Sequence, residues 1–249
     1  MTAPSFIINL PRSRNRIPYV YNQIVKAGYM NVHVFDAVDG TNPTEVNDAK
    51  ILFNGPKIDD IKLGAIGCLL SHMKVLSYII QNNIPVATIF EDDVHFHPEW
   101  ETLSKHYYDL TPKDYEVLFM GNQLNSCLVP QKDISEITTE YCYCMHAYVV
   151  TLEGAKKMLD TILHYKLGKG LCEVDCILFN LIRYNKKNDL PHPFTFYSWN
   201  GTKYPCSYNK ITKDNCRNTG LVFQNLAFVS QIDDSKIIRK PLKKRMVII

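Results

Sequence analysis

The stretch Val86-Ala87-Thr88-Ile89-Phe90, followed at once by Glu91-Asp92-Asp93 and Val94, decides how the rest of the sequence is interpreted. Five residues with strand propensity lead directly into three adjacent carboxylates, as expected for a buried strand that delivers acidic groups to the rim of a sheet. Burying three like charges together is costly. The carboxylates therefore either open into solvent or share a divalent cation that reverses the local charge balance, and the triplet by itself permits both.

The composition is that of a folded chain with a modest charge. The 249 residues are 46% hydrophobic and 21% charged, so they can form one large domain or two closely joined ones. A net charge of +3 gives no reason to expect nucleic-acid binding. Eight cysteines are too few for a disulfide scaffold at this length, which favours reduced, structural cysteines.

The two ends of the sequence bear on localisation. Residues 1–5 lead straight into a strand-like run without a signal-peptide pattern, so we expect a cytoplasmic protein. We find no apolar run of the roughly 18 residues needed to span a bilayer, so membrane contact is expected only at the periphery. The basic C-terminal tail is either a solvated end, which we favour, or a contact with an anionic membrane surface. Its basic residues are Arg239, Lys240, Lys243, Lys244 and Arg245.

The N-terminal segment is typical of a βαβ unit. Residues 6–10 and 32–35 are predicted strands, and the helix between them begins near Ile17 and ends at Gly28. The two strands should be parallel, with a right-handed crossover. Three arginines follow the first strand, where an open α/β sheet binds anions, although a solvated helical turn explains them equally well. They are Arg12, Arg14 and Arg16.

The middle of the chain is expected to hold a long loop and a buried helix. Residues 41–63 lack clear periodicity and predict a loop, whereas apolar positions after Gly64 predict a helix packed inside the fold. Ser71 and His72 lie within that helix, where a histidine is more often a satisfied core residue than a ligand. Residues 122–123 are expected to form a polar loop after the next strand.

Two later segments carry residue types that bind metals or protons. Residues 141–150 are predicted as one strand on which Cys142, Cys144 and His146 share a face. Zinc sites usually draw ligands from turns, so we favour core packing there. Asp175 precedes a predicted helix, which suits an N-cap as well as a catalytic acid.

Several of these segments, taken in order, resemble glycosyltransferase family 25, which includes bacterial lipopolysaccharide sugar transferases and collagen galactosyltransferases. The likeness covers roughly residues 5 to 182, and the blocks are specific in combination although each alone is weak. The blocks are Ile8-Asn9-Leu10 with Arg12 and Arg16, Ala37-Val38-Asp39-Gly40, Ile66-Gly67-Cys68-Leu69-Leu70-Ser71-His72, Phe90-Glu91-Asp92-Asp93-Val94, Ala147-Tyr148-Val149-Val150 with Gly154-Ala155-Lys156-Lys157, and Val174-Asp175.

The resemblance implies an α/β fold of GT-A type, a Rossmann-like mixed sheet flanked by helices. Residues 1–185 would form the nucleotide-sugar-binding and catalytic core, and residues 186–249 would complete the acceptor side. Such folds hold a divalent ion, Mn²⁺ or Mg²⁺, together with a nucleotide-sugar donor at an acidic strand end. Hard carboxylate oxygens suit these ions.

The same resemblance assigns roles to individual residues. Glu91 and Asp93 are the expected metal ligands, and Asp175 is the expected base that removes the acceptor's proton. His192 is a further candidate metal ligand. The expected donor-binding residues are Asn9, Leu10, Arg12, Arg16, Asp39, Gly40, Ser71, His72, Glu91 and Asp92.

The implied function is transfer of a hexose, galactose or glucose, from a UDP-sugar with inversion. The acceptor would be a hydroxyl on a glycan, a lipopolysaccharide or a hydroxylysine-type protein. One departure supports an alternative, because the family commonly has glutamate where this chain has Ala65. The alternative hypothesis is therefore a catalytically impaired homologue that binds a glycan or a partner protein.

Overall fold

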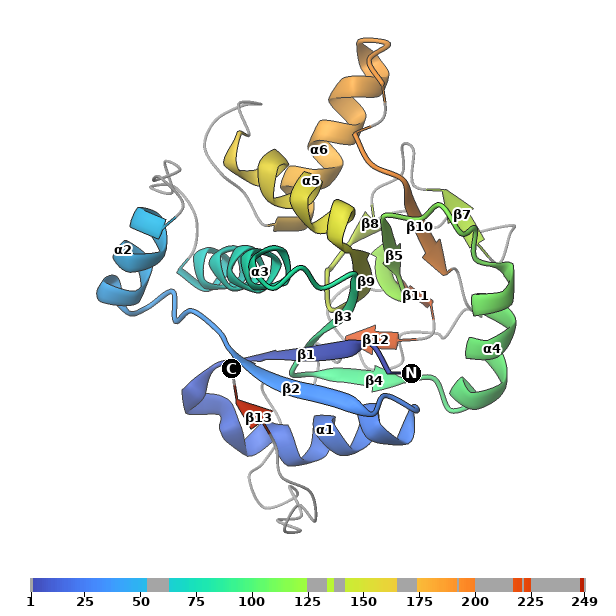
Figure 1. Cartoon of the computed structure of the whole chain (residues 1–249), viewed down its shortest axis with the longest axis horizontal. Coiled ribbons are helices and arrows are strands. Elements are labelled where there is room, and N and C mark those ends of the chain that lie inside the picture. The colour runs from blue at the N-terminus through green and yellow to red at the C-terminus, as the bar shows by residue number, and fades with distance from the viewer. Residues whose placement is uncertain are drawn as a thin grey trace.

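The computed structural model describes residues 2–52, 63–124, 134–136, 142–164, 174–191, 193–199, 217–220, 222–224 and 247–248. The basic tail at residues 239–245, His192 and residues 53–62 of the expected loop lie outside this part of the chain. Within the described residues, one eight-stranded sheet forms the centre of the fold (Figure 1). In spatial order its strands are β13 (Val247–Ile248), β2 (Asn31–Asp36), β1 (Pro4–Asn9), β3 (Val86–Glu91), β9 (Ala147–Thr151), β5 (Val117–Phe119), β10 (Phe196–Trp199) and β7 (Ile134–Glu136).

The sheet is mixed. Strands β13, β2, β1 and β3 are mutually parallel, with Ile8 paired to Glu91 and Asn9 paired to Asp36. Strand β9 runs antiparallel to both β3 and β5, β10 is parallel to β5, and β7 is antiparallel to β10. The predicted α/β class with a mixed sheet flanked by helices is confirmed.

Helices cover both faces of this sheet because successive strand residues point to opposite sides. Phe6 and Ile8 pack into the core on one face, whereas Ile7 packs into the core on the other. The first core takes residues from α3 (Leu63–Gln81), α5 (Leu152–Leu163) and α6 (Val174–Lys187), and the second takes residues from α1 (Ile17–Lys26) and α4 (Trp100–Leu110). Figure 1 shows α1 on the side opposite to α3, α5 and α6.

The order of the parallel strands sets where a ligand can bind. The chain passes from β1 to its neighbour β2 through α1, and then from β2 to β3, on the other side of β1, through α3. The two connections use opposite faces, so a crevice opens beside the carboxyl ends of β1 and β3. Asn9 and Glu91 are the last residues of those two strands.

Two small sheets follow the acidic triplet. Strand β4 (Val94–Phe96) pairs antiparallel with β12 (Val222–Gln224), and β6 (Gly121–Leu124) lies between β11 (Arg217–Gly220) and β8 (Cys142–Tyr143). The predicted loop at residues 122–123 was therefore wrong. The partner strands come from distant parts of the sequence, so local composition carries no signal for this pairing.

The strand expected over residues 141–150 is broken into β8 and β9. Cys144 adopts φ 73°, and its backbone N–H donates 2.7 Å to an Asp175 carboxylate oxygen rather than to a neighbouring strand. A positive φ is uncommon outside glycine and interrupts an extended strand. Cys142, Cys144 and His146 consequently do not line one continuous strand, while His146 is buried as the core-packing interpretation expects.

Residues 43–52 of the expected loop form a helix, α2 (Pro43–Leu52). Its start follows local rules, since the Asn42 side chain accepts 3.1 Å from the Thr44 N–H and Pro43 occupies the first helical position. The helix is polar, so apolar periodicity gave no indication of it.

Helix α3 contradicts the expectation that no apolar segment is long enough to span a bilayer. Its 19 residues are long and apolar enough, by length and composition, to cross a membrane. More than half of its most apolar window is buried inside the fold, against the central sheet. Core helices of globular domains share these properties.

The predicted division after residue 185 falls within α6. Beyond it, β10 and β13 pair with strands of the main sheet, and β12 pairs with β4. The assignment of residues 186–249 to the acceptor side stays a prediction.

Candidate active site

A pocket of about 330 Å³ opens at the carboxyl ends of β1 and β3. Sites of this size, with convergent polar groups, are typical of small-molecule binding. Among the residues that the structure describes, the pocket brings together all of the expected donor and metal residues except Asn9; Asp175 also lies outside its lining, and the candidate His192 lies outside the described residues. Its walls are Ile8, Leu10, Arg12, Arg16, Ala37, Val38, Asp39, Gly40, Thr41, Gly64, Gly67, Cys68, Ser71, His72, Glu91, Asp92 and Asp93.

One wall is the short 3-10 helix η1 (Pro11–Arg16) that follows β1. The buried Asn9 side chain donates 2.6 Å to Asp92, and Arg16 forms an ion pair of 3.0 Å with the other oxygen of the same carboxylate. Asp92 is thereby held by two partners from the first strand and its loop. Arg14 instead pairs with Asp36 and with Asn9, and it does not line the pocket.

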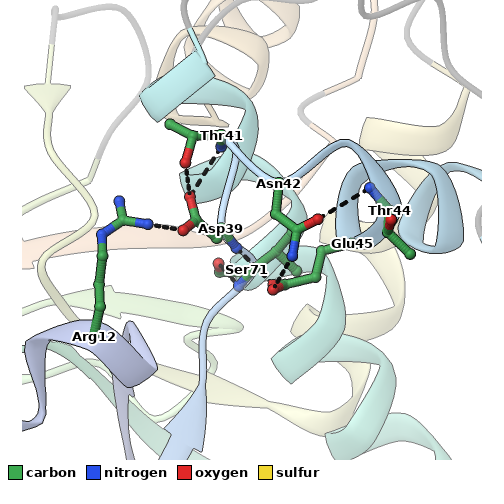
Figure 2. A network of polar contacts seen from close by, with 8 residues as sticks. Arg12, Asp39, Thr41, Asn42, Thr44, Glu45 and Ser71 are labelled. Atoms are coloured by element: carbon green, nitrogen blue, oxygen red, sulfur yellow. Dashed lines mark hydrogen bonds and ion pairs between the residues drawn. The ribbon is translucent and has the colours of Figure 1, made fainter.

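The opposite wall is the turn that leads into α2, shown in Figure 2. Asp39 accepts hydrogen bonds from the backbone and the hydroxyl of Thr41, and it forms an ion pair with Arg12, which also lines the pocket. Glu45 accepts 2.9 Å from the Asp39 N–H and 2.8 Å from Asn42. The network fixes the turn with local bonds, so its side chains reach the pocket in a set orientation.

The N-terminal part of α3 forms the third wall, where it touches the same turn at close range. Gly64, Gly67, Cys68 and Ser71 recur at helical spacing on the face that lines the pocket. A Cβ on Gly67 would lie 2.7 Å from the Val38 carbonyl oxygen and 2.8 Å from Gly40 N, so glycine permits this backbone contact.

The carboxylates of the triplet have different environments. Glu91 turns toward α3, where it meets His72 and Cys68, whereas Asp92 turns toward η1. The pKa of Asp93 is raised well above its usual value by burial and then by the charges of Glu91 and Asp92. Burial also raises the pKa of Asp92 despite Arg16 and Asn9. For Glu91 burial acts to raise the pKa, but hydrogen bonding and charge from His72 and the charge of His146 lower it overall.

Asp93 is the member of the triplet best suited to a cation. Its Oδ1 atom is buried and has no hydrogen-bond partner within the described part of the chain. A buried, unsatisfied carboxylate oxygen beside two further acids is unfavourable alone, and a divalent ion would reverse that balance. Oxygen ligands of this kind fit Mn²⁺ or Mg²⁺.

His72 lies between the triplet and the buried aromatic core. Its Nδ1 contacts the Tyr148 hydroxyl at 3.0 Å and its Nε2 lies 3.5 Å from Glu91 Oε1. The Cys68 thiol lies one helical turn earlier, with its Sγ 3.9 Å from the same Glu91 oxygen. Cys68 belongs to the family-like block at residues 66–72, but the sequence assigned it no role. Only the fold reveals that it faces Glu91.

Asp175 lies in the first turn of α6 rather than before the helix. Its carboxylate accepts the backbone N–H groups of Cys144 at 2.7 Å and Cys176 at 2.8 Å. Its charge acts on the pocket-lining Cys68 thiol, whose pKa is raised by burial first and then by the charges of Glu91, Asp175 and Cys144. Its assignment as a base stays a prediction.

Comparison with known proteins identifies the family. Residues 2–178 match the sequence profile described as "Glycosyltransferase family 25 (LPS biosynthesis protein)". The chain belongs to glycosyltransferase family 25. Within this family-25 chain, the matched range includes every pocket-lining residue and Asp175.

Relatives of this family-25 chain include much longer proteins. It is 25% identical over 170 residues to procollagen galactosyltransferase 1-A of Xenopus laevis, and 26% identical over 172 residues to procollagen galactosyltransferase 2 of Homo sapiens. Each alignment covers 62% of this chain but only 28% and 27% of those relatives. The chain thus spans little more than a quarter of the length of the relatives that it matches.

Solved structures with a similar arrangement also occur. One is a glycosyltransferase involved in glycosylation of the major capsid of PBCV-1, with 10% identity, a TM-score of 0.43, and coverage of 80% of this chain and 81% of that one. Another is a UDP-glucose pyrophosphorylase complexed with UDP-glucose, with 10% identity, a TM-score of 0.43, and coverage of 80% and 90%.

Proposed function

We propose that the protein transfers a hexose, galactose or glucose, from a UDP-sugar to an acceptor hydroxyl with inversion, using Mn²⁺ or Mg²⁺. Membership of family 25 supports sugar transfer. The observation that carries the metal-dependent form is the buried Oδ1 of Asp93 on the pocket wall, which has no hydrogen-bond partner among the residues that the structure describes. The procollagen galactosyltransferases among its relatives support galactose as the first donor to test.

In this proposal the two sides of the pocket bind opposite charges. Glu91 and Asp93 hold the cation, which when bound would neutralise the charge that develops on the departing diphosphate. Arg12, Arg16 and the N-terminal turns of α3 provide positive potential for the phosphates. Asn9 acts indirectly, because it holds Asp92 in place with a 2.6 Å hydrogen bond.

Inversion requires a base for the acceptor hydroxyl, and we assign that role to Asp175. Its negative charge acts on Cys68, which lines the pocket, so an acceptor entering on the Cys68 side comes nearest to it. We propose a hydroxyl on a glycan, a lipopolysaccharide or a hydroxylysine-type protein as acceptor. We further propose a cytoplasmic protein whose basic tail is a solvated end, with contact to an anionic membrane surface as the alternative.

The deciding experiment measures Mn²⁺-dependent binding and hydrolysis of a panel of UDP-sugars, which needs no acceptor. We expect UDP-galactose or UDP-glucose to bind and hydrolyse slowly, and Asp93→Ala to abolish the metal-dependent rate. Asp109→Ala, at an exposed position on α4, is the matched control and should keep that rate. Full activity in Asp93→Ala would remove Asp93 from the proposed role.

The same panel tests the alternative hypothesis of a catalytically impaired homologue, which Ala65 motivates. Ala65 is partly buried in the first turn of α3 and does not line the pocket. A folded protein that neither binds nor hydrolyses any UDP-sugar would favour a glycan- or protein-binding module and refute the enzyme.

Asp175 needs a test that separates a base from a structural role, since its carboxylate also holds the Cys144 turn. Asp175→Asn keeps an oxygen acceptor for the Cys144 N–H but loses the one for the Cys176 N–H, so thermal unfolding of the variant is measured alongside to check that the fold survives. If Asp175 is the base, transfer to a known acceptor falls sharply and loses its acidic pH limb, while donor binding is retained. An unchanged pH profile would exclude the assignment.

A further inference from the structure

A second group of potential metal ligands lies beside the acidic triplet and involves a thiol. Cys68 and His72 are four residues apart on α3, so they share one face of the helix. Glu91, at the end of β3, faces them, and one ligand atom from each of the three residues lies within 4.8 Å of the others. All three residues line the pocket, which gives an ion a route of entry.

The separations of the three ligand atoms are close to, and partly longer than, those of a zinc site. With bond lengths of about 2.3 Å to sulfur and 2.0 to 2.2 Å to nitrogen and oxygen, tetrahedral geometry separates ligand atoms by about 3.3 to 3.7 Å. Here Glu91 Oε1 is 3.5 Å from His72 Nε2 and 3.9 Å from Cys68 Sγ. Small side-chain rotations would suffice to bring the three atoms onto one ion.

The surroundings also suit a bound cation. The Tyr148 hydroxyl oxygen, 3.0 Å from His72 Nδ1, can accept a hydrogen bond from Nδ1–H, and this tautomer leaves Nε2 as the metal ligand. Tyr148 is fully buried, and burial raises the pKa of its hydroxyl, so it stays neutral and able to accept. Asp175 and Cys144 add negative or potentially negative groups near Cys68.

We propose that Cys68, His72 and Glu91 form a binding site for a soft divalent ion such as Zn²⁺, which lies beside the Mn²⁺ or Mg²⁺ position at Asp93 and shares Glu91 with it. Binding releases the thiol proton of Cys68 to solvent as the thiolate coordinates the ion. The donor set differs in kind from that of the triplet, because sulfur and imidazole favour zinc whereas carboxylates alone favour the harder ions. A fourth position remains for water or a pocket ligand, as at zinc sites with three protein ligands.

The test uses Co²⁺ as a spectroscopic probe on the full, reduced chain after chelator treatment. We expect a sulfur-to-cobalt charge-transfer band and the visible bands of tetrahedral cobalt, saturating at one equivalent and displaced by Zn²⁺. Cys68→Ser should remove the charge-transfer band and weaken Zn²⁺ binding by more than about 100-fold, beyond what loss of a supporting group alone causes. The matched control Cys176→Ser should keep the band.

Two further measurements separate this thiol-containing site from the carboxylate site at Asp93. Asp93→Ala should retain the band, so the result does not depend on sugar transfer or on the proposed donor-metal pair. X-ray absorption on the zinc-loaded wild type should show one sulfur together with nitrogen and oxygen ligands, which requires no variant to fold. A band that survives in Cys68→Ser, a wild type without a band, or a zinc shell without sulfur would each overturn the proposal.

Discussion

Replacement of Ser71 by alanine tests how the pocket wall is built. Ser71 is 1% exposed, and its hydroxyl accepts 2.8 Å from the Val38 N–H while donating 2.5 Å to the Gly67 carbonyl. Both partners belong to pocket walls, so this hydroxyl joins the turn after β2 to α3. The sequence assigned Ser71 to donor binding, whereas these bonds indicate that it also anchors the turn.

The expected cost follows from the group left behind. Ser71→Ala leaves the buried Val38 N–H without its partner, which costs about 1 to 3 kcal/mol. For a chain of this size that lowers the midpoint of thermal unfolding by about 2 to 12 °C. Alanine also has a higher helix propensity than serine, which offsets about 0.5 kcal/mol.

The assay compares denaturant and thermal unfolding of Ser71→Ala with those of Ser77→Ala. Ser77 lies on the same helix, is only partly buried, and accepts a weak 3.2 Å hydrogen bond from Gln81, so its substitution measures mainly the propensity gain. The free energy of unfolding of Ser71→Ala should be about 1 to 3 kcal/mol lower than that of Ser77→Ala. If the two variants unfold with equal free energies, the anchoring role of the Ser71 hydroxyl is wrong.

Three further predictions concern charges and caps. The folded-state pKa of Asp93 is raised, so the fold favours the protonated carboxyl group. The stability that this group contributes is fully present below its unfolded pKa of about 4 and is lost as pH rises through the folded pKa. Metal-free wild type should therefore lose thermal stability relative to Asp93→Asn between mildly acidic and neutral pH, and equal pH dependence in the two would contradict this. Arg16→Met should cost about 1.5 to 3 kcal/mol in chemical unfolding, because it removes a charged partner of the mostly buried Asp92. Arg12→Met removes a half-exposed ion pair and should cost less than about 1 kcal/mol. A larger loss of unfolding free energy in Arg12→Met than in Arg16→Met would refute the idea that Arg16 is the more important partner for stability. Thr151→Val removes the 3.0 Å cap to the Gly154 N–H of α5 and should cost about 1 kcal/mol by thermal melting, whereas no change would show that the cap is dispensable.

Much of the fold was predictable because its signals are local. The βαβ unit, α3, β3 and the capped start of α5 each follow from apolar spacing or from a terminal residue such as Gly28 or Thr151. Helix α2 escaped prediction because its polar face lacks apolar periodicity, although its Asn42 cap carried a usable signal. Strand β6 had no local signal, since its partners come from residues 142–143 and 217–220.

The sequence by itself determined the chemical types of the candidate site and their family pattern, because a strand that ends in Glu91-Asp92-Asp93 places acids at a sheet rim. Tertiary structure decided what each acid faces. Asp92 is held by Asn9 and Arg16, Glu91 meets Cys68 and His72, and Asp93 keeps a buried oxygen without a partner among the described residues. The physical reason is that pairing, burial and charge depend on neighbours brought together by strand order and helix packing, which residue spacing along the chain does not encode.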